Sequence, residues 1–115
     1  MTMSVGKLGE KAACRYLKKC GYSIVEKNYA TRFGEVDIIA IYGDFIVFVE
    51  VKTRSLNPMT SALSSVDEYK QDRIRKTAMS YLKIKESDKQ PRFDVIEVLY
   101  DNRKYKVKEH IVNAF

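Results

Sequence analysis

The chain has 115 residues, of which 45% are hydrophobic and 31% are charged, and its formal net charge at pH 7 is +6. This length and balance predict a single globular domain over 1–115 that buries a core without staples, and the longest apolar run, Phe45 to Val49, is far too short to span a membrane. The excess of positive charge favours nucleic acid as a partner over an anionic membrane surface, although many small basic proteins bind neither.

The first predicted element is a helix from Ser4 to Cys20, where apolar residues recur at helical spacing. Ser4 is a typical N-cap residue, and Gly21 can supply the left-handed conformation after the helix. Cys14 and Cys20 would lie about 9 Å apart along the axis and on different sides, too far for a disulfide. Because His110 is the only histidine, a zinc site of thiols and imidazoles cannot form. Free thiols and the absence of an apolar export signal indicate a cytoplasmic protein.

Three strands are predicted next, over 22–29, 35–41 and 45–52. Tyr42-Gly43-Asp44 separates the last two, so these should form an antiparallel hairpin. The segment 55–65 contains Asn57-Pro58 and small polar residues, which is typical of a loop.

A second helix is predicted to begin at Ser65-Val66-Asp67-Glu68, which has the Ser-x-x-Glu form of a capping box, and to end near Ile84. Its expected buried side carries Val66, Tyr69, Ile74, Ala78, Tyr81 and Leu82. Arg73, Lys76, Ser80 and Lys83 share another face, which is either simply solvated or a phosphate-binding stripe.

The last predicted strands are Phe93–Tyr100 and Tyr105–Val112, and in the second of these lysines alternate with Tyr105 and Val107. The whole order is α-β-β-β-α-β-β. It predicts an α/β fold with a mixed five-stranded sheet flanked by helices.

The strand 45–52 is unusual because its end places two charges, Glu50 and Lys52, on the same face as Ile46 and Phe48. Counting outward from the turn at 42–44 puts Asp37 roughly opposite Val49 or Glu50. The two acids can therefore come within reach of one ion. Such hard oxygen ligands suit Mg²⁺ or Mn²⁺, and Lys52 can position or deprotonate a water molecule. The alternative is a structural salt bridge of Lys52 with either acid.

The pattern of Asp37 followed after a hairpin by Glu50-Val51-Lys52 resembles the PD-(D/E)xK nuclease motif. The whole chain resembles the YraN family of small bacterial proteins in that superfamily. The matching stretches are GKLGEKAA (6–13), GEVDIIA (34–40), FVEVKTR (48–54), RFDVIEV (92–98) and HIVNAF (110–115).

This resemblance implies a restriction-endonuclease-like fold similar to that of Holliday-junction resolvases. It implies that Asp37, Glu50 and the backbone carbonyl of Val51 bind the metal, that Lys52 is catalytic, and that Glu10 joins the site, either directly or through water. From spacing alone, Glu10 is equally well a solvated acid on the first helix.

We therefore hypothesise a Mg²⁺- or Mn²⁺-dependent nuclease acting on DNA, with branched or junction DNA as the favoured substrate by analogy, and a homodimer if two strands are cut. The candidate nucleic-acid contacts are Arg32, Arg54, Lys70, Arg73 and Lys76. Arg54 could instead pair with Glu35 or Asp94, and Arg92 with Asp94 reads as a structural pair. A non-catalytic nucleic-acid-binding or adaptor protein on the same scaffold, and a nuclease of single strands or RNA, are the alternatives.

Overall fold

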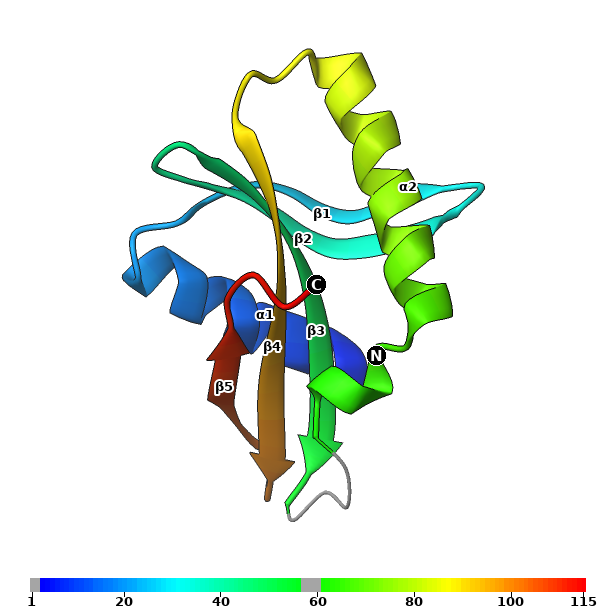
Figure 1. Ribbon diagram of the computed structural model, residues 1–115. Coiled ribbons are helices and arrows are strands. Elements are labelled where there is room, and N and C mark those ends of the chain that lie inside the picture. Colours follow the sequence, from blue (N-terminus) through cyan, green and yellow to red (C-terminus); the bar gives the residue numbers. More distant parts are fainter. Residues whose placement is uncertain (1–2, 57–60) are drawn as a thin grey trace.

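The computed structural model describes residues 3–56 and 61–115, which form two helices and five strands (Figure 1). The elements are α1 (Val5–Lys19), β1 (Ser23–Thr31), β2 (Gly34–Tyr42), β3 (Phe45–Ser55), the 3₁₀ turn η1 (Leu63–Ser65), α2 (Glu68–Lys85), β4 (Gln90–Asp101) and β5 (Lys104–Ile111). The predicted order and the α/β class are confirmed. Part of the predicted loop over 55–65, residues 57–60, lies outside the described residues.

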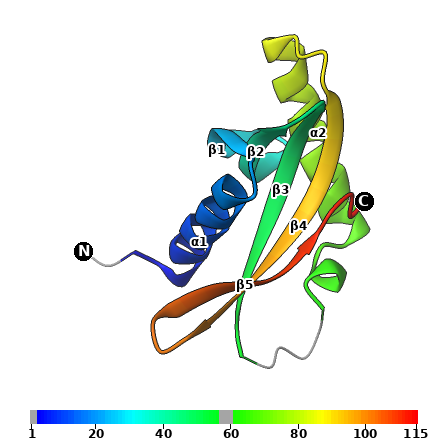
Figure 2. The ribbon, with the colours of Figure 1, turned by 90° about the vertical axis from the view of Figure 1, so that its left-hand side faces the viewer.

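The sheet has the order β1-β2-β3-β4-β5, and every neighbouring pair is antiparallel except β3 and β4. The parallel pair is aligned over the whole of β3, from Phe45 opposite Gln90 to Ser55 opposite Tyr100. A parallel pair needs a crossover connection, and α2 supplies it. Figure 2 shows α1 on one side of the sheet and α2 on the other, so both faces are covered.

β3 lies at the centre of the sheet, and its two faces supply two separate cores. Val47 and Val49 pack on the α1 side, whereas Ile46 and Phe48 pack on the α2 side. This alternation is the predicted one, and it places Glu50 and Lys52 on the face toward α2. The polar end of the strand is therefore held by a fully buried apolar half.

The helix ends agree with the prediction for α1 but not for α2. Ser4 accepts a hydrogen bond from the Lys7 amide, and Gly21 has the expected positive φ of 92°. The N-cap of α2 is Asp67, whose side chain accepts the Lys70 amide, so the predicted capping box at Ser65 is wrong. Ser65 lies instead in η1, where its hydroxyl donates a hydrogen bond to the Ala62 carbonyl and so does not cap α2.

The start of α2 also differs from its predicted buried side. Tyr69 is 71% exposed, whereas Ile74, Ala78 and Tyr81 are buried as predicted. Shifting the N-cap to Asp67 places Tyr69 in the first turn, beyond the edge of the apolar core.

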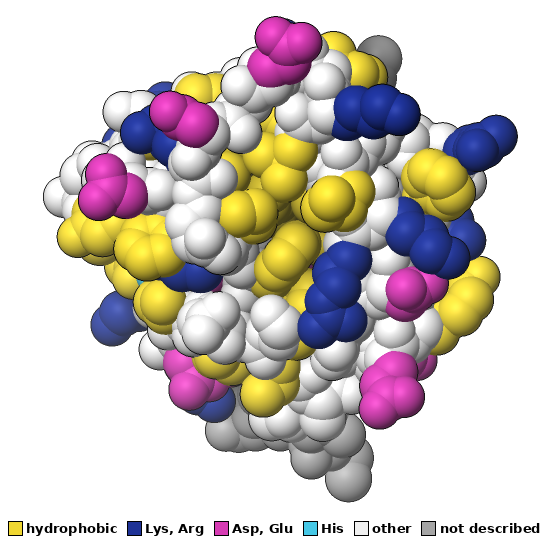
Figure 3. Space-filling model, turned by 45° about the horizontal axis from the view of Figure 1, so that its top comes forward, with side chains coloured by type: hydrophobic (Ala, Val, Ile, Leu, Met, Phe, Trp, Pro, Cys, Tyr) yellow, Lys and Arg dark blue, Asp and Glu magenta, His cyan; other side chains and the backbone are white. Residues whose placement is uncertain are grey.

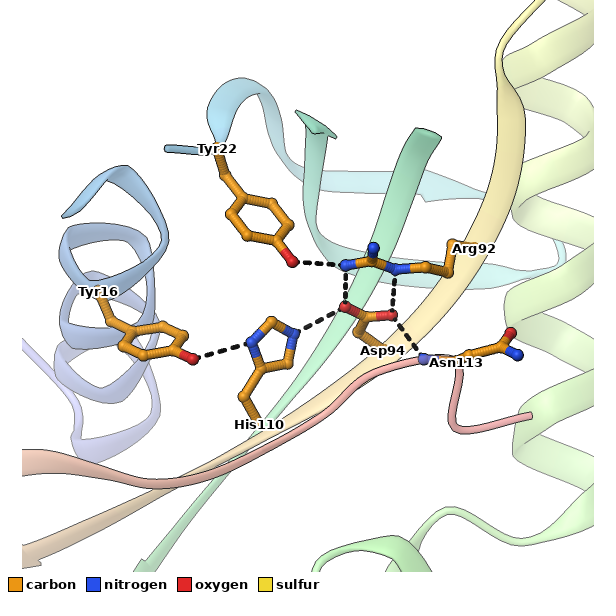
Figure 4. Close-up of polar contacts among 6 residues, drawn as sticks. All are labelled: Tyr16, Tyr22, Arg92, Asp94, His110 and Asn113. Atoms are coloured by element: carbon orange, nitrogen blue, oxygen red, sulfur yellow. Dashed lines mark hydrogen bonds and ion pairs between the residues drawn. The ribbon is translucent and has the colours of Figure 1, made fainter. Parts of the chain in front are cut away.

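A buried ionic network joins the end of the chain to the sheet (Figure 4). Asp94 has no exposed surface; it accepts hydrogen bonds from Arg92 and His110 at 2.7 Å each and from the Asn113 amide at 3.0 Å. The other ring nitrogen of His110 lies 3.0 Å from the Tyr16 hydroxyl on α1. The predicted pair of Arg92 with Asp94 is confirmed, and the network around it fastens α1, β4 and the C-terminal segment together.

The surface at the top of Figure 1 is hollowed, with hydrophobic side chains in the hollow and Lys and Arg along one side (Figure 3). The exposed large hydrophobic residues of the described chain include Met79 and Ile84 on α2. No helix among the described residues is long and apolar enough to cross a membrane.

Replacing Asp94 with Asn should destabilise the protein by about 3–5 kcal/mol, because Arg92 would keep a buried charge without its counter-ion. The matched control is Asp101→Asn, which removes an exposed carboxylate from the same strand and should stay within about 0.5 kcal/mol of wild type. Urea unfolding monitored by circular dichroism measures both. Equal stabilities for the two variants would contradict a structural role of the network.

The difference in stability between wild type and Asp94→Asn should also depend on pH. Burial alone would raise the pKa of Asp94, but the hydrogen bonds from His110, Arg92 and the Asn113 amide outweigh it and hold the pKa below its ordinary value. The stabilisation is therefore complete above the unfolded pKa of about 3.9 and is lost as pH falls through the lower folded value. The difference in unfolding free energy between wild type and Asp94→Asn should shrink between about pH 5 and pH 2.

Candidate active site

The candidate site lies where β2 and β3 stop pairing. Their last paired residues are Ile38 and Val49, so Asp37 and Glu50 are the first residues beyond the ladder. There the side chain of Asp37 replaces a backbone partner: its Oδ2 accepts the Val51 amide at 2.8 Å. Because the two strands separate at this step, two acidic side chains can occupy the gap.

The two acids affect each other strongly. Burial, followed by the hydrogen bond with Glu50 and the charge of Glu50, raises the pKa of Asp37 to about 9, against the opposing effect of the Val51 amide. The side chain of Glu50 is only 6% exposed. At neutral pH and without a cation, the pair therefore holds a proton between two carboxyl groups.

Two lysines lie beside the acids, and their environments differ. The Nζ of Lys70 lies 2.7 Å from Oε2 of Glu50. Burial lowers the pKa of Lys70, but hydrogen bonds with Glu50 and Lys52 and the charge of Glu50 outweigh it, so the pKa is raised. Burial, together with the neighbouring Lys70, lowers the pKa of Lys52. Lys70 is thus suited to remain charged, and Lys52 is the lysine that can lose its proton.

The polar row continues along the same face of the sheet. Arg54 pairs with Glu97 on β4, with Nε at 3.0 Å from Oε2, rather than with Glu35 or Asp94 as considered from the sequence. Glu97 is 2% exposed, lies opposite Lys52 in the parallel register, and also has Lys108 at 3.8 Å.

Glu97 is the site neighbour that sequence reasoning missed. The alternation of side chains between the two faces of the strand RFDVIEV (92–98) could have identified Glu97. Phe93, Val95 and Glu97 share one face of β4, so Glu97 ends an apolar row as Glu50 does on β3.

Gly9 allows α1 to approach β3 next to the site. A Cβ atom on Gly9 would lie 1.8 Å from Oγ1 of Thr53 and 2.8 Å from its Cβ. Thr53 directly follows Lys52, so this contact holds the first turns of α1 against the polar end of β3.

The same approach brings Glu10 toward the site without joining it to the pair. Glu10 forms an ion pair with Lys7 at 3.4 Å, and its charge is the smallest of the influences raising the pKa of Asp37. In the part of the chain that the structure describes, no three His, Cys, Asp or Glu side chains converge closely enough to hold an ion. The two carboxylates that come together are those of Asp37 and Glu50, and a role of Glu10 through water stays a prediction.

The donor set fits a hard divalent cation. The carboxylates of Asp37 and Glu50, with the Val51 carbonyl as the predicted third ligand, are oxygen donors of the kind that Mg²⁺ and Mn²⁺ accept while retaining several waters. The raised pKa of Asp37 and the Lys70 ammonium beside Glu50 both reduce the negative charge of the pair, as is expected where two carboxyl groups lie close together.

The predicted nucleic-acid contacts are divided between the site and the surface. Arg54 and Lys70 bind the acids of the site, and Lys76 pairs with Asp72 at 3.0 Å on the surface of α2. The guanidinium of Arg73 lies over the Tyr69 ring, and that of Arg32 lies 4.9 Å from the centre of the Phe33 ring. Arg32 and Arg73 are thus the two predicted contacts that have no acidic partner among the described residues.

Comparison with known proteins identifies a family. The model of the uncharacterised protein family UPF0102 matches residues 9–98. A UPF0102 protein from Alkaliphilus oremlandii is 48% identical over 118 residues and covers 100% of both chains. Similar proteins from Caldanaerobacter subterraneus (45% identical, 97% of this chain and 94% of the relative) and Pelotomaculum thermopropionicum (44%, 96% and 94%) carry the same family name.

Replacing Asp37 with Asn should stabilise the cation-free protein by about 1–2 kcal/mol at pH 8. The new amide oxygen can still accept the Val51 amide while its NH₂ group donates to Glu50. The wild-type Asp37 is ionised in the unfolded chain and must instead take up a proton on folding, at a cost that grows as pH rises from about 4 toward about 9. The gap measured by urea unfolding should therefore be larger at pH 8 than at pH 5, with exposed Glu35→Gln as control. A variant less stable than wild type at pH 8 would contradict the carboxyl pair.

Replacing Gly9 with Ala should cost about 1–3 kcal/mol, because the added methyl group overlaps Thr53 and pushes α1 away from β3. Gly6 in the same helix is the matched control, since the nearest atom to its added Cβ is the Ser4 hydroxyl at 4.0 Å. Gly6→Ala should be neutral or stabilising by up to about 1 kcal/mol. Thermal unfolding compares them, and similar losses for both variants would show that the close approach is unimportant.

Proposed function

The chain belongs to the UPF0102 family, and we propose that it is a divalent-metal-dependent nuclease that hydrolyses DNA phosphodiester bonds. The observation that carries the proposal is the carboxyl pair of half-buried Asp37 and buried Glu50 at the point where β2 and β3 separate, with two lysines whose pKa values shift in opposite directions beside it. Paired carboxylates next to cationic groups are the donors that phosphoryl-group hydrolysis requires.

In the proposed reaction, Asp37, Glu50 and the Val51 carbonyl would hold Mg²⁺ or Mn²⁺. The bound cation would polarise the scissile phosphate and lower the pKa of the attacking water. Lys52, whose pKa is lowered, accepts a proton from that water as its oxygen forms the new bond to phosphorus. The bond to the leaving oxygen breaks on the opposite side, and that oxygen takes a proton from solvent. Lys70 remains an ammonium and balances the charge that develops on the phosphate.

The resemblance to the YraN family and the PD-(D/E)xK superfamily supports the same reaction and extends it. By that analogy, the substrate is branched or junction DNA, the enzyme acts in the cytoplasm, and two copies act together on two strands. Glu10 would contribute through water rather than directly, because its nearest ionic partner is Lys7.

One observation favours a second candidate, a non-catalytic DNA-binding or adaptor protein. The Lys70 ammonium lies 2.7 Å from Glu50 and can substitute permanently for a metal ion. In that case the acids and lysines would form a structural ion-pair cluster, and nucleic-acid binding would not need a divalent cation.

A cleavage panel distinguishes the two. Purified protein with Mg²⁺ or Mn²⁺ should cut one or more of duplex, flap and four-way-junction DNA. Lys52→Ala and Asp37→Ala should each reduce the rate by about 10²–10⁴-fold, as expected for loss of a proton acceptor or a metal ligand. Lys85→Ala, an exposed lysine at the end of α2, is the matched control and should cut at the wild-type rate.

Three other outcomes would contradict or change the proposed function. Cleavage that persists in Asp37→Ala protein would remove this mechanism. Binding of DNA without any cleavage, and without dependence on Mg²⁺, would favour the adaptor. Single-stranded DNA and RNA belong in the same panel, and cleavage restricted to them would replace duplex or branched DNA as the substrate.

A further inference from the structure

A row of cations runs along α1, away from the carboxyl pair. Lys7, Lys11, Arg15 and Lys18 are spaced by four, four and three residues, so they share one face of the helix. At about 1.5 Å per residue, the row extends over about 16 Å. All four side chains belong to exposed residues.

These cations line a groove with a volume of about 440 Å³ between α1 and β1, which lie near each other in Figure 2. From β1, Lys27 and Asn28 contribute to the opposite wall. The lining therefore contains five cations and one carboxylate, that of Glu10.

The positive charge of this groove is largely uncompensated. Glu10 pairs with Lys7, while Lys11, Arg15, Lys18 and Lys27 have no ion pair with an acidic group among the described residues. On α2, Lys70 pairs with Glu50 and Lys76 pairs with Asp72, whereas the remaining cations of that helix also lack an acidic partner among the described residues. The α1 row differs because its cations line one groove together with Lys27. The α1 groove is thus a concentrated positive surface that is available to an anionic partner.

The groove lies near the polar end of β3. Glu10 lines the groove, and Gly9, the preceding residue, lies against Thr53, which directly follows Lys52 in the chain. A polyanion that follows α1 would therefore reach the end of β3 that carries Glu50 and Lys52.

We propose that this groove holds the phosphate backbone of a DNA duplex that flanks the scissile phosphate. The inference rests on the proposed nuclease function and names the surface that would hold its substrate. Lysine and arginine side chains that contact phosphates position a duplex without reading its sequence.

The lining of the groove favours a duplex over a single strand. Single-strand binding sites combine cations with aromatic side chains on which bases stack. None of the described residues that line this groove is aromatic. An anionic membrane fits less well, because the apolar face of α1, including Ala13 and Leu17, is fully buried against the sheet.

The test removes the charge of the row while keeping the chain intact. The triple variant Lys11→Gln/Arg15→Gln/Lys18→Gln is compared with Lys85→Gln/Lys89→Gln/Arg103→Gln, which loses the same charge but lines no part of the groove. Binding to a labelled duplex of about 20 base pairs is measured by fluorescence anisotropy in EDTA at several salt concentrations. Thermal unfolding verifies that both variants fold.

The groove variant should bind the duplex about 10–100-fold more weakly, and the slope of log K against log[salt] should become shallower by about 2.7, since each phosphate contact contributes about 0.9. The control triple should change both quantities much less. Equal losses in the two triples, or an unchanged slope in the groove variant, would overturn the proposal. A loss confined to single-stranded DNA or to RNA of the same length would also overturn it and name another occupant.

This experiment separates the groove from the reaction, because EDTA removes any need for cleavage. If groove-dependent binding occurs in a protein that never cuts, the nuclease function fails and the groove stands. If cleavage occurs and the groove variant binds and cuts duplex DNA as wild type does, the groove fails and the nuclease function stands.

Discussion

The candidate site depends on one hydrogen bond, from the Val51 amide to the carboxyl group of Asp37 at 2.8 Å. This bond replaces a backbone hydrogen bond of the sheet at the position where β2 and β3 separate, just beyond the last paired residues, Ile38 and Val49. A backbone amide at the centre of a sheet must find an acceptor, and here a side chain supplies it. That same bond fixes Asp37 beside Glu50. The separation of the strands and the convergence of the acids are therefore two consequences of one contact.

Holding two carboxyl groups together costs free energy, and the rest of the fold must supply it. Val47, Val49 and Phe48 have no exposed surface and anchor β3 on both faces before its polar end begins. On the α1 side of the sheet, Asp94 is fully satisfied by Arg92, His110 and the Asn113 amide. The fold thus contains two ionic clusters, one in which Asp94 is held by several direct partners, and another in which Asp37 and Glu50 are balanced by a proton and by Lys70. The second, with its strongly shifted pKa, is the one on which the proposed function rests.

The sequence allowed the element order, the faces of β3 and the meeting of Asp37 with Glu50 to be predicted, because alternation and a tight turn are local properties. It did not reveal how the charges pair. Arg54 contacts Glu97 because the parallel register of β3 and β4 brings Lys52 opposite Glu97, and parallel register is set by a crossover that no local pattern encodes. The N-cap at Asp67 was missed for a related reason, since two adjacent sequences could both cap α2 and only packing on the sheet selects between them.

The positions of the positive charges are more informative about function than the net charge of +6 alone. Lys70 and Arg54 neutralise acids at the site, and Lys76 pairs with Asp72 on the surface of α2. The row on α1 keeps its charge, because its one nearby acid, Glu10, is occupied by Lys7. Because these cations line one groove, their positive field acts at one place on the surface. Solubility alone would be served as well by scattered charges, so the proposal of a polyanionic partner rests on this clustering and not on the net charge.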